Sequence, residues 1–127
     1  MAASDLFDHR PKPDATARFL AERGHHLLIA YDGAEPIGFV SGVETVHPDK
    51  GTEMFLYELG VAESHHRRGV GRALVEHLAT VARSIGCYGM WVATDDTNVA
   101  AMATYEATGA TRDDKPAVIL TWRFDAT

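Results

Sequence analysis

The chain has 127 residues, of which 46% are hydrophobic and 24% are charged, and its formal net charge is −6 at neutral pH. This length predicts one domain spanning residues 1–127, and no apolar run is long enough to cross a membrane. The acidic net charge argues against a nucleic-acid-binding surface. The first residues do not resemble a secretory signal, and the single cysteine, Cys87, excludes an internal disulfide. A cytoplasmic protein is therefore expected.

The first half of the sequence predicts one helix followed by three strands. Asp14 is placed to cap a helix that ends at Gly24. Three apolar runs follow, separated by turn-forming residues, and they are expected to form an antiparallel meander. The predicted strands are residues 26–31, 36–43 and 53–61.

The second half predicts a helix, a strand, a helix and a strand. Apolar residues from Val70 to Ile85 recur with helical spacing on one face, and Gly86 ends that helix. A shorter helix begins at Asn98 and ends before Gly109. The predicted strands of this half are residues 88–94 and 118–124. A meander followed by a strand–helix–strand crossover predicts an α+β fold, or an α/β-type fold, with a mixed sheet.

Two glycines at the start of the longer helix indicate a phosphate site. Gly69 and Gly71 leave the backbone open to a ligand, and the first amides of a helix have no partner within it. Positive charge surrounds this turn, at Arg67, Arg68 and Arg72. The segment therefore predicts a binding site for a pyrophosphate, which indicates a nucleotide-containing cofactor. The dinucleotide-binding fingerprint and the P-loop both fail, because neither a third glycine nor a Gly-Lys-Ser/Thr sequence follows.

This glycine turn resembles that of the GNAT N-acetyltransferases, which bind acetyl-CoA. Asn98, Ala101, Tyr105 and Gly109 also have the spacing that the family shows after its fourth main strand. The resemblance implies that Asn98 contacts the cofactor and that the Tyr105 hydroxyl protonates the departing CoA thiolate. An ordinary packed aromatic side chain is the alternative interpretation of Tyr105. The first position of the glycine motif is His66, where the family has Gln or Arg.

A closer resemblance joins residues 53–61 to the matching strand of the small aminoglycoside 3-N-acetyltransferases. Glu58 takes the place of an aspartate in those enzymes, and Gly60 takes the place of an alanine. The resemblance implies that the acceptor is the 3-amino group of an aminoglycoside antibiotic or a similar polycationic amine, and it implies a homodimer. Members of the family usually begin with a strand, and only a few residues precede Asp14. That strand is missing, replaced by the first few residues or supplied by a partner subunit, and a shortened N-terminus is expected.

The resemblance also implies how the cofactor is held. Two parallel strands splay at a bulge, which Gly60 would ease, and pantetheine lies in the gap along the backbone of Leu59 and Val61. The cofactor-binding residues that it implies are Leu59, Gly60, Val61, His66, Arg67, Arg68, Gly69, Val70, Gly71, Arg72, Asn98, Ala101 and Tyr105.

Glu58 is the expected general base. Strand alternation predicts that it shares a face with Met54 and Leu56, opposite to Leu59. A structural or surface carboxylate is the alternative interpretation. The carboxylates expected to bind the substrate are Glu53, Glu58, Asp95 and Asp96. For the last two, helix capping is the alternative.

Three functions fit these patterns. The first is acetyl transfer from acetyl-CoA to an aminoglycoside or similar amine, and the second is acetylation of a protein N-terminus, a lysine or a small metabolite amine. The third is a non-catalytic module that binds acyl-CoA. No metal site is expected, because His25-His26 and His65-His66 are adjacent pairs whose side chains do not converge on one ion.

Overall fold

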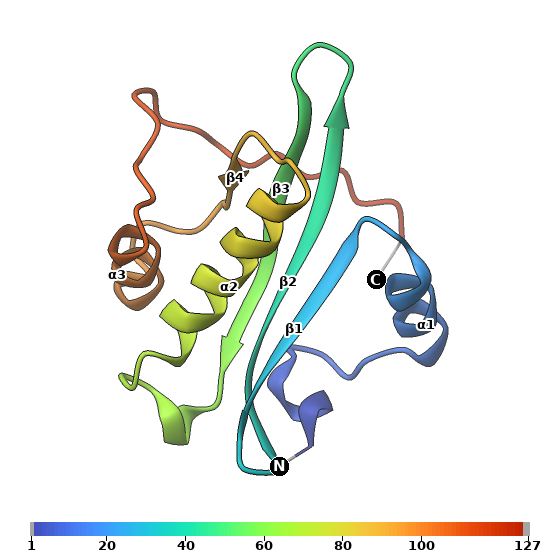
Figure 1. Cartoon of the computed structure of the whole chain (residues 1–127), viewed down its shortest axis with the longest axis vertical. Helices are drawn as coiled ribbons and strands as arrows, with labels where there is room; N and C mark the ends of the chain where they lie inside the picture. The colour runs from blue at the N-terminus through green and yellow to red at the C-terminus, as the bar shows by residue number, and fades with distance from the viewer. Residues whose placement is uncertain (1, 126–127) are drawn as a thin grey trace.

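The computed structural model describes residues 2–125 as a sheet with helices packed against it (Figure 1). In chain order the elements are a 3-10 turn η1 (Ala3–Leu6), α1 (Pro13–Ala21), β1 (His25–Asp32), β2 (Glu35–His47), β3 (Gly51–Val61), a 3-10 turn η2 (Glu63–His65), α2 (Val70–Ser84), β4 (Met90–Trp91) and α3 (Val99–Ala107). None of the helices in this described part is long and apolar enough to span a membrane.

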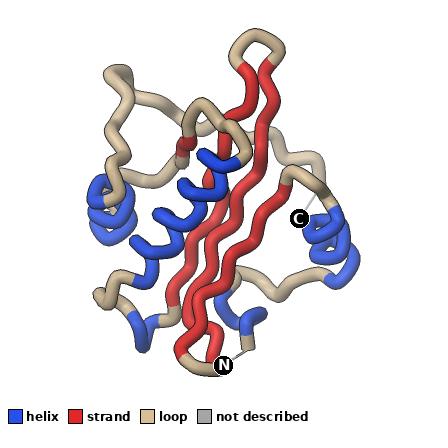
Figure 2. Tube along the Cα trace, viewed as in Figure 1, coloured by secondary structure: helices blue, strands red, loops and turns tan. Residues whose placement is uncertain are grey.

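The sheet has the strand order β1-β2-β3-β4, so neighbours in the chain are neighbours in space. The first three strands form an antiparallel meander, and β4 returns parallel to β3 after the crossover through α2. Figure 2 shows α2 lying along one face of the long strands. The mixed sheet and the strand–helix–strand crossover that the sequence predicts are therefore confirmed.

The core lies between α2 and the sheet. Leu74, Val75, Leu78 and Ala82 form the buried stripe of α2, and they pack on side chains of β2 and β3 that are themselves buried, Val40, Met54 and Leu56. The helix can approach this closely because Gly42 has no side chain. A methyl group there would lie 2.8 Å from the Met54 sulfur, closer than real contacts allow, and 3.0 Å from Leu78, which is tighter than most real contacts.

The strands of the sheet differ in length from the prediction. β2 continues to His47 and β3 begins at Gly51, because these two residues pair with each other around a turn of only three residues. β4 is shorter than residues 88–94, since only Met90 and Trp91 find a partner on β3. Strand length is set by where a neighbouring backbone lies within reach, which the side-chain pattern does not encode.

The predicted closing strand at residues 118–124 is wrong. This segment forms no strand, and its large apolar side chains are between 74% and 96% exposed. The apolar residues concerned are Val118, Ile119, Leu120, Trp122 and Phe124. A strand requires a hydrogen-bonding partner, and in residues 2–125 the sheet ends at β4 with no further strand paired to it.

The N-terminal elements cover part of the opposite face of the sheet. η1 packs against β2 and α1 packs against β1. The Phe7 ring stacks on the Phe39 ring at a centroid distance of 4.1 Å. No strand precedes β1 in the part of the chain that the structure describes.

Candidate active site

The glycine turn leads directly into α2. Arg67 has a φ of 63° and Gly69 has a φ of 80°, so both lie in the left-handed region, which only glycine adopts without strain. Gly69 is the N-cap of α2, and the first backbone bond of the helix runs from the Ala73 amide to the Gly69 carbonyl at 2.9 Å. The amides of residues 70–72 precede that bond, so they form the positive end of the helix, where an anion is stabilised.

Two side chains expected to contact phosphate have partners within the protein. The His66 Nε2 donates to the Val61 carbonyl at 2.9 Å, which ties the turn to the end of β3. The Arg72 guanidinium lies 2.9 Å from the Glu76 carboxylate, one helical turn further on, and both side chains are more than half exposed. Such a pair contributes less than about 1 kcal/mol, so Arg72 can exchange Glu76 for another anion. His66 therefore has an observed structural role that differs from the expected phosphate contact.

β3 has an open backbone edge beside this turn. It pairs with β4 at Met54 and Phe55 only, although it continues to Val61, so the two strands diverge beyond that point in the described structure. The start of α2 lies beside this edge. A methyl group at Gly71 would lie 3.6 Å from Val61, 3.8 Å from Leu59 and 3.6 Å from Thr104 of α3. The helix start, the open edge and α3 therefore meet around Gly71.

The expected orientation of Glu58 is wrong, because β3 carries a bulge. Ser41 pairs with Glu58 and the next residue, Gly42, pairs with Leu56, so Tyr57 is an extra residue. Since cross-strand partners share a face, Glu58 lies with Ser41 on the face away from α2. Leu59 instead faces α2 and packs against the core. One inserted residue inverts the alternation of every residue after it.

The bulge is also not at Gly60, where it was expected. It is centred on Tyr57. A methyl group at Gly60 would lie 2.7 Å from the Phe39 ring and 3.0 Å from the Leu6 carbonyl oxygen. Gly60 therefore allows the N-terminal segment to approach the sheet, and it does not produce the change of register.

Tyr105 lies on α3 and packs against the core cluster between α2 and the sheet. Its partial burial raises the pKa of the hydroxyl above the ordinary tyrosine value, because a phenolate is poorly stabilised among apolar groups. The hydroxyl therefore stays protonated at neutral pH, which is the state that a proton donor requires.

The family follows from this geometry together with the sequence. The profile of the Acetyltransferase (GNAT) family matches residues 2–110. The chain belongs to the GNAT family of acetyltransferases. Among curated proteins it is similar to human N-acetyltransferase 8, with 29% identity over 97 residues, or 76% of this chain and 43% of the relative. It is also similar to the [ribosomal protein bS18]-alanine N-acetyltransferase of Escherichia coli K12, with 37% identity over 57 residues, or 45% of this chain and 38% of the relative. These alignments span less than half the length of either curated relative.

Solved structures of acetyltransferases share the fold. The aminoglycoside acetyltransferase HMB0005 from an uncultured soil metagenomic sample superposes with a TM-score of 0.76 at 26% identity, covering 90% of this chain and 77% of that chain. AAC(6')-Iy, in complex with the bisubstrate analogue CoA-S-monomethyl-acetylneamine, superposes with a TM-score of 0.79 at 20% identity, covering 94% of this chain and 86% of that chain. The mixed four-stranded sheet is therefore a GNAT fold.

Within this GNAT fold, the residues before α3 have local partners. The Asn98 Oδ1 accepts from the Ala101 amide at 3.1 Å, so Asn98 is the N-cap of α3. The Asp95 carboxylate accepts from the Thr97 amide at 3.0 Å and from its hydroxyl at 2.8 Å, and these bonds lower the pKa of Asp95. Asp96 pairs with the exposed Arg112 at 3.0 Å. Helix capping was the alternative for Asp95 and Asp96, but Asn98 is the residue that caps α3. Asp95 instead bonds Thr97, and Asp96 instead pairs with Arg112.

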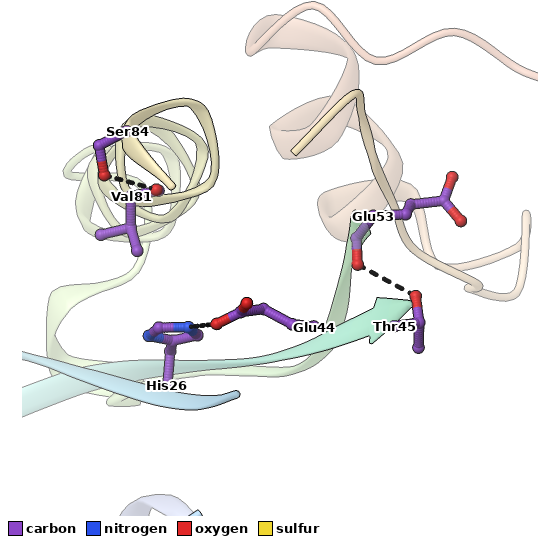
Figure 3. Close-up of polar contacts among 6 residues, drawn as sticks. All are labelled: His26, Glu44, Thr45, Glu53, Val81 and Ser84. Atoms are coloured by element: carbon purple, nitrogen blue, oxygen red, sulfur yellow. Dashed lines mark hydrogen bonds and ion pairs between the residues drawn. The ribbon is translucent and has the colours of Figure 1, made fainter. Parts of the chain in front are cut away.

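Glu53 belongs to one of two histidine–carboxylate pairs near the C-terminal end of β2. The His47 Nε2 lies 3.2 Å from the Glu53 Oε1, and the His26 Nε2 lies 2.7 Å from the Glu44 Oε2. Figure 3 shows Glu44 directed at His26, whereas the Glu53 side chain points away from that pair. In residues 2–125 no three His, Cys, Asp or Glu side chains are grouped so that they could hold a metal ion.

Sequence reasoning missed a row of aromatic side chains on the face that carries Glu58. Phe55 pairs with Val43 on β2 and with Trp91 on β4, so these residues share the Glu58 face. The Phe55 and Trp91 rings stack with their centroids 4.3 Å apart. No signal in the sequence gives the register between β3 and β4, which brings these two rings together.

Proposed function

We propose that the protein is an acetyl-CoA-dependent N-acetyltransferase whose acceptor is the 3-amino group of an aminoglycoside antibiotic or a similar polycationic amine. The observation that carries the proposal is the meeting of three features around Gly71: the free helix-start amides, the open edge of β3, and α3 with Tyr105. A pyrophosphate fits the first feature and an extended pantetheine arm fits the second. The complex of AAC(6')-Iy with a CoA-containing analogue supports the same donor here.

The cofactor would lie along a continuous path. The pyrophosphate binds the amides at Gly69, Val70 and Gly71, with charge from Arg67, Arg68 and Arg72. The pantetheine then adds to the backbone of β3 between Val61 and Leu59, passing Gly60. Asn98 and Ala101, at the start of α3, border the path near Tyr105, and His66 holds the turn against the end of β3.

The acid and the base would act from opposite faces of β3. The Glu58 carboxylate takes a proton from the acceptor ammonium, and the neutral nitrogen then attacks the thioester carbonyl carbon from the face of Glu58. As the C–N bond forms and the C–S bond breaks, the Tyr105 hydroxyl gives its proton to the leaving sulfur. The products are the acetylated amine and free coenzyme A. Glu58 and Tyr105 are well placed for this division, because the bulge at Tyr57 turns Glu58 away from the face on which Tyr105 lies.

The acidic charge supports a cationic acceptor. The net charge of −6 favours the approach of a polycation, and Glu53, Asp95 and Asp96 offer carboxylates for additional ammonium groups. HMB0005, an aminoglycoside acetyltransferase with 26% identity to this chain, supports the same class of acceptor. A second candidate is acetylation of a protein N-terminus, which the 37% identity to the ribosomal-protein alanine N-acetyltransferase supports. An acyl-CoA-binding module without activity is disfavoured because the chain carries both a candidate acid, Tyr105, and a candidate base, Glu58.

We further propose a cytoplasmic homodimer. The apolar residues of the segment 118–124 have no cover within the described chain, and exposed apolar surface of this kind marks an interface. Trp122 and Phe124 together offer roughly 300–500 Å², a large part of the roughly 800 Å² that each partner contributes to a stable interface. Sedimentation velocity tests this proposal. The wild type is expected to sediment as a dimer and the double variant Trp122→Ser, Phe124→Ser as a monomer, and a monomeric wild type would refute it.

The decisive experiment on the function combines a binding measurement with a screen. Acetyl-CoA is titrated into the wild type, Gly71→Phe and Gly71→Ala by calorimetry. Alanine makes only ordinary contacts at this position and is expected to keep affinity within about threefold, whereas phenylalanine fills the path and is expected to abolish binding. Thiol release is then followed with aminoglycosides, linear polyamines and N-terminal peptides. Absence of acetyl-CoA binding by the wild type would refute the proposal, and release with peptides alone would favour the second candidate.

A further inference from the structure

Three aromatic side chains form a continuous strip on the face of the sheet away from α2. The Phe55 ring stacks on Trp91 at 4.3 Å with an interplanar angle of 23°. It also contacts the Tyr57 ring at 5.5 Å and 39°. Trp91 remains 46% exposed and Tyr57 remains 61% exposed, so the strip is open to solvent. We call these three residues the aromatic strip.

The strip lies where β3 and β4 begin to diverge. Phe55 and Trp91 form the last paired positions of the two strands, and Tyr57 is the bulged residue that follows. Glu58 comes next, on the same face. If the cofactor enters the gap from Val61, its acetyl group reaches β3 near Glu58, at the edge of the strip. The strip therefore borders the point at which an acceptor must arrive.

The other half of this face already has a cover. η1 packs on β2, where Phe7 stacks on Phe39, and α1 packs on β1, where Phe19 lies 4.8 Å from the His25 ring. These elements cover part of β1 and β2. The aromatic surface on β3 and β4 is the part of the face that keeps two large rings substantially exposed. Exposed aromatic surface beside a carboxylate is typical of a ligand site.

We propose that the aromatic strip is the acceptor platform, and that it selects an amine carried on a ring over an amine on a flexible chain. This inference rests on the proposed function and names the shape of the acceptor. A rigid ring lays its flat side on Trp91 and Phe55, while its ammonium group meets Glu58. An aromatic face also attracts cations directly, and its rigidity means that little entropy is lost on binding. A linear amine gains only the contact with Glu58, because covering the rings would cost it conformational entropy.

The test compares Trp91→Ala with Tyr31→Ala, an exposed aromatic residue at the β1–β2 hairpin. KM is measured for an aminocyclitol-containing aminoglycoside and for spermidine, and the Kd of acetyl-CoA is measured by calorimetry. Trp91→Ala is expected to raise KM for the ring amine about tenfold, to change KM for spermidine less than twofold, and to leave the Kd of acetyl-CoA unchanged. Trp91→Phe is expected to restore most of the loss. An equal rise for both amines, or no rise for either, would overturn the proposal.

A second measurement does not depend on the stability of Trp91→Ala. The chain has two tryptophans, so Trp122→Phe leaves Trp91 as the only indole fluorophore. Addition of the aminoglycoside is expected to quench or shift this emission with saturation, and spermidine is expected to leave it unchanged. Emission that does not respond to a ring amine turned over by the enzyme would refute the platform while leaving the acetyltransferase proposal intact. Failure of acetyl-CoA to bind would refute the proposed function, whereas a saturable Trp91 response would still support the platform.

Discussion

The two faces of β3 differ in what their side chains do. The face toward α2 is closed: Met54 and Leu56 are buried beneath the helix, and Gly42 lets that helix come close. The face away from α2 is only half covered, and it presents Glu58 with the aromatic strip. The closed face of β3 contributes to the core, and the open face carries the acceptor site that we propose. Substitutions on the closed face are therefore expected to change the free energy of unfolding, and those on the open face to change turnover.

Leu78→Ala gives the largest expected effect. Leu78 is fully buried between α2 and the sheet, so its truncation leaves a cavity and is expected to lower the free energy of unfolding by about 3 kcal/mol. Urea denaturation measures this loss. The matched variant on the open face is Trp91→Ala, which is expected to lower stability by less than about 1 kcal/mol, because the ring is nearly half exposed. Equal losses for the two variants would remove the distinction between the faces.

Tyr105→Phe is expected to lower kcat about 100-fold, because the leaving thiolate loses its proton donor. The phenyl ring keeps the packing of Tyr105 against the core, so the Kd of acetyl-CoA and the unfolding midpoint should change little. Single-turnover kinetics and calorimetry give the two quantities separately, and Tyr31→Phe is the control. A parallel loss of affinity and turnover would assign Tyr105 a packing role.

Glu58→Gln is expected to lower kcat/KM about 30-fold at pH 7, since the glutamine amide cannot take a proton from the ammonium. The loss should shrink as the pH rises toward 10, because a growing fraction of the acceptor is then already neutral. A pH–rate profile of wild type and variant measures this convergence. The control Glu44→Gln changes a carboxylate that pairs with His26 and should leave the profile unchanged. A constant ratio across the pH range would contradict the role of Glu58 as the base.

The smallest expected effect is on alkaline stability. Burial raises the pKa of Tyr105 in the folded protein above the value of about 10 in the unfolded chain. Above pH 10 the unfolded chain therefore ionises this tyrosine first, so the stabilisation is complete below pH 10 and is lost as the pH rises through the folded pKa. The fall in melting temperature between pH 9 and pH 11 should be smaller for Tyr105→Phe than for the wild type. A larger fall in the variant would contradict this direction.

Local patterns in the sequence were enough to predict several helices and strands. The apolar spacing from Val70 to Ile85 predicts α2 to within a residue at each end, because a 15-residue amphipathic helix needs only one neighbouring face to bury. Gly69, with its positive φ, begins that helix as predicted. The meander also follows from the sequence, because its strands are long and the turns between them are short.

The orientation of Glu58 shows where such patterns fail. Alternation along residues 53–61 assigns Glu58 to the face of Met54 and Leu56, and it would be right for a regular strand. Tyr57 is an extra residue only in relation to the register between β3 and β2. A bulge is therefore a property of two paired strands, and the sequence of one strand does not reveal it. The segment 118–124 fails for a related reason, since its apolar residues look like a strand but pair with no strand of the described sheet.

The sequence by itself determined the glycine turn, the helix that follows it, and the kind of ligand that such a turn binds, because each depends on residues close together in the chain. Only the tertiary structure decided which face of β3 carries the carboxylate and that Trp91 stacks on Phe55 beside it. These features depend on the register between strands, and that register is set by the packing of α2 and the sheet as a whole.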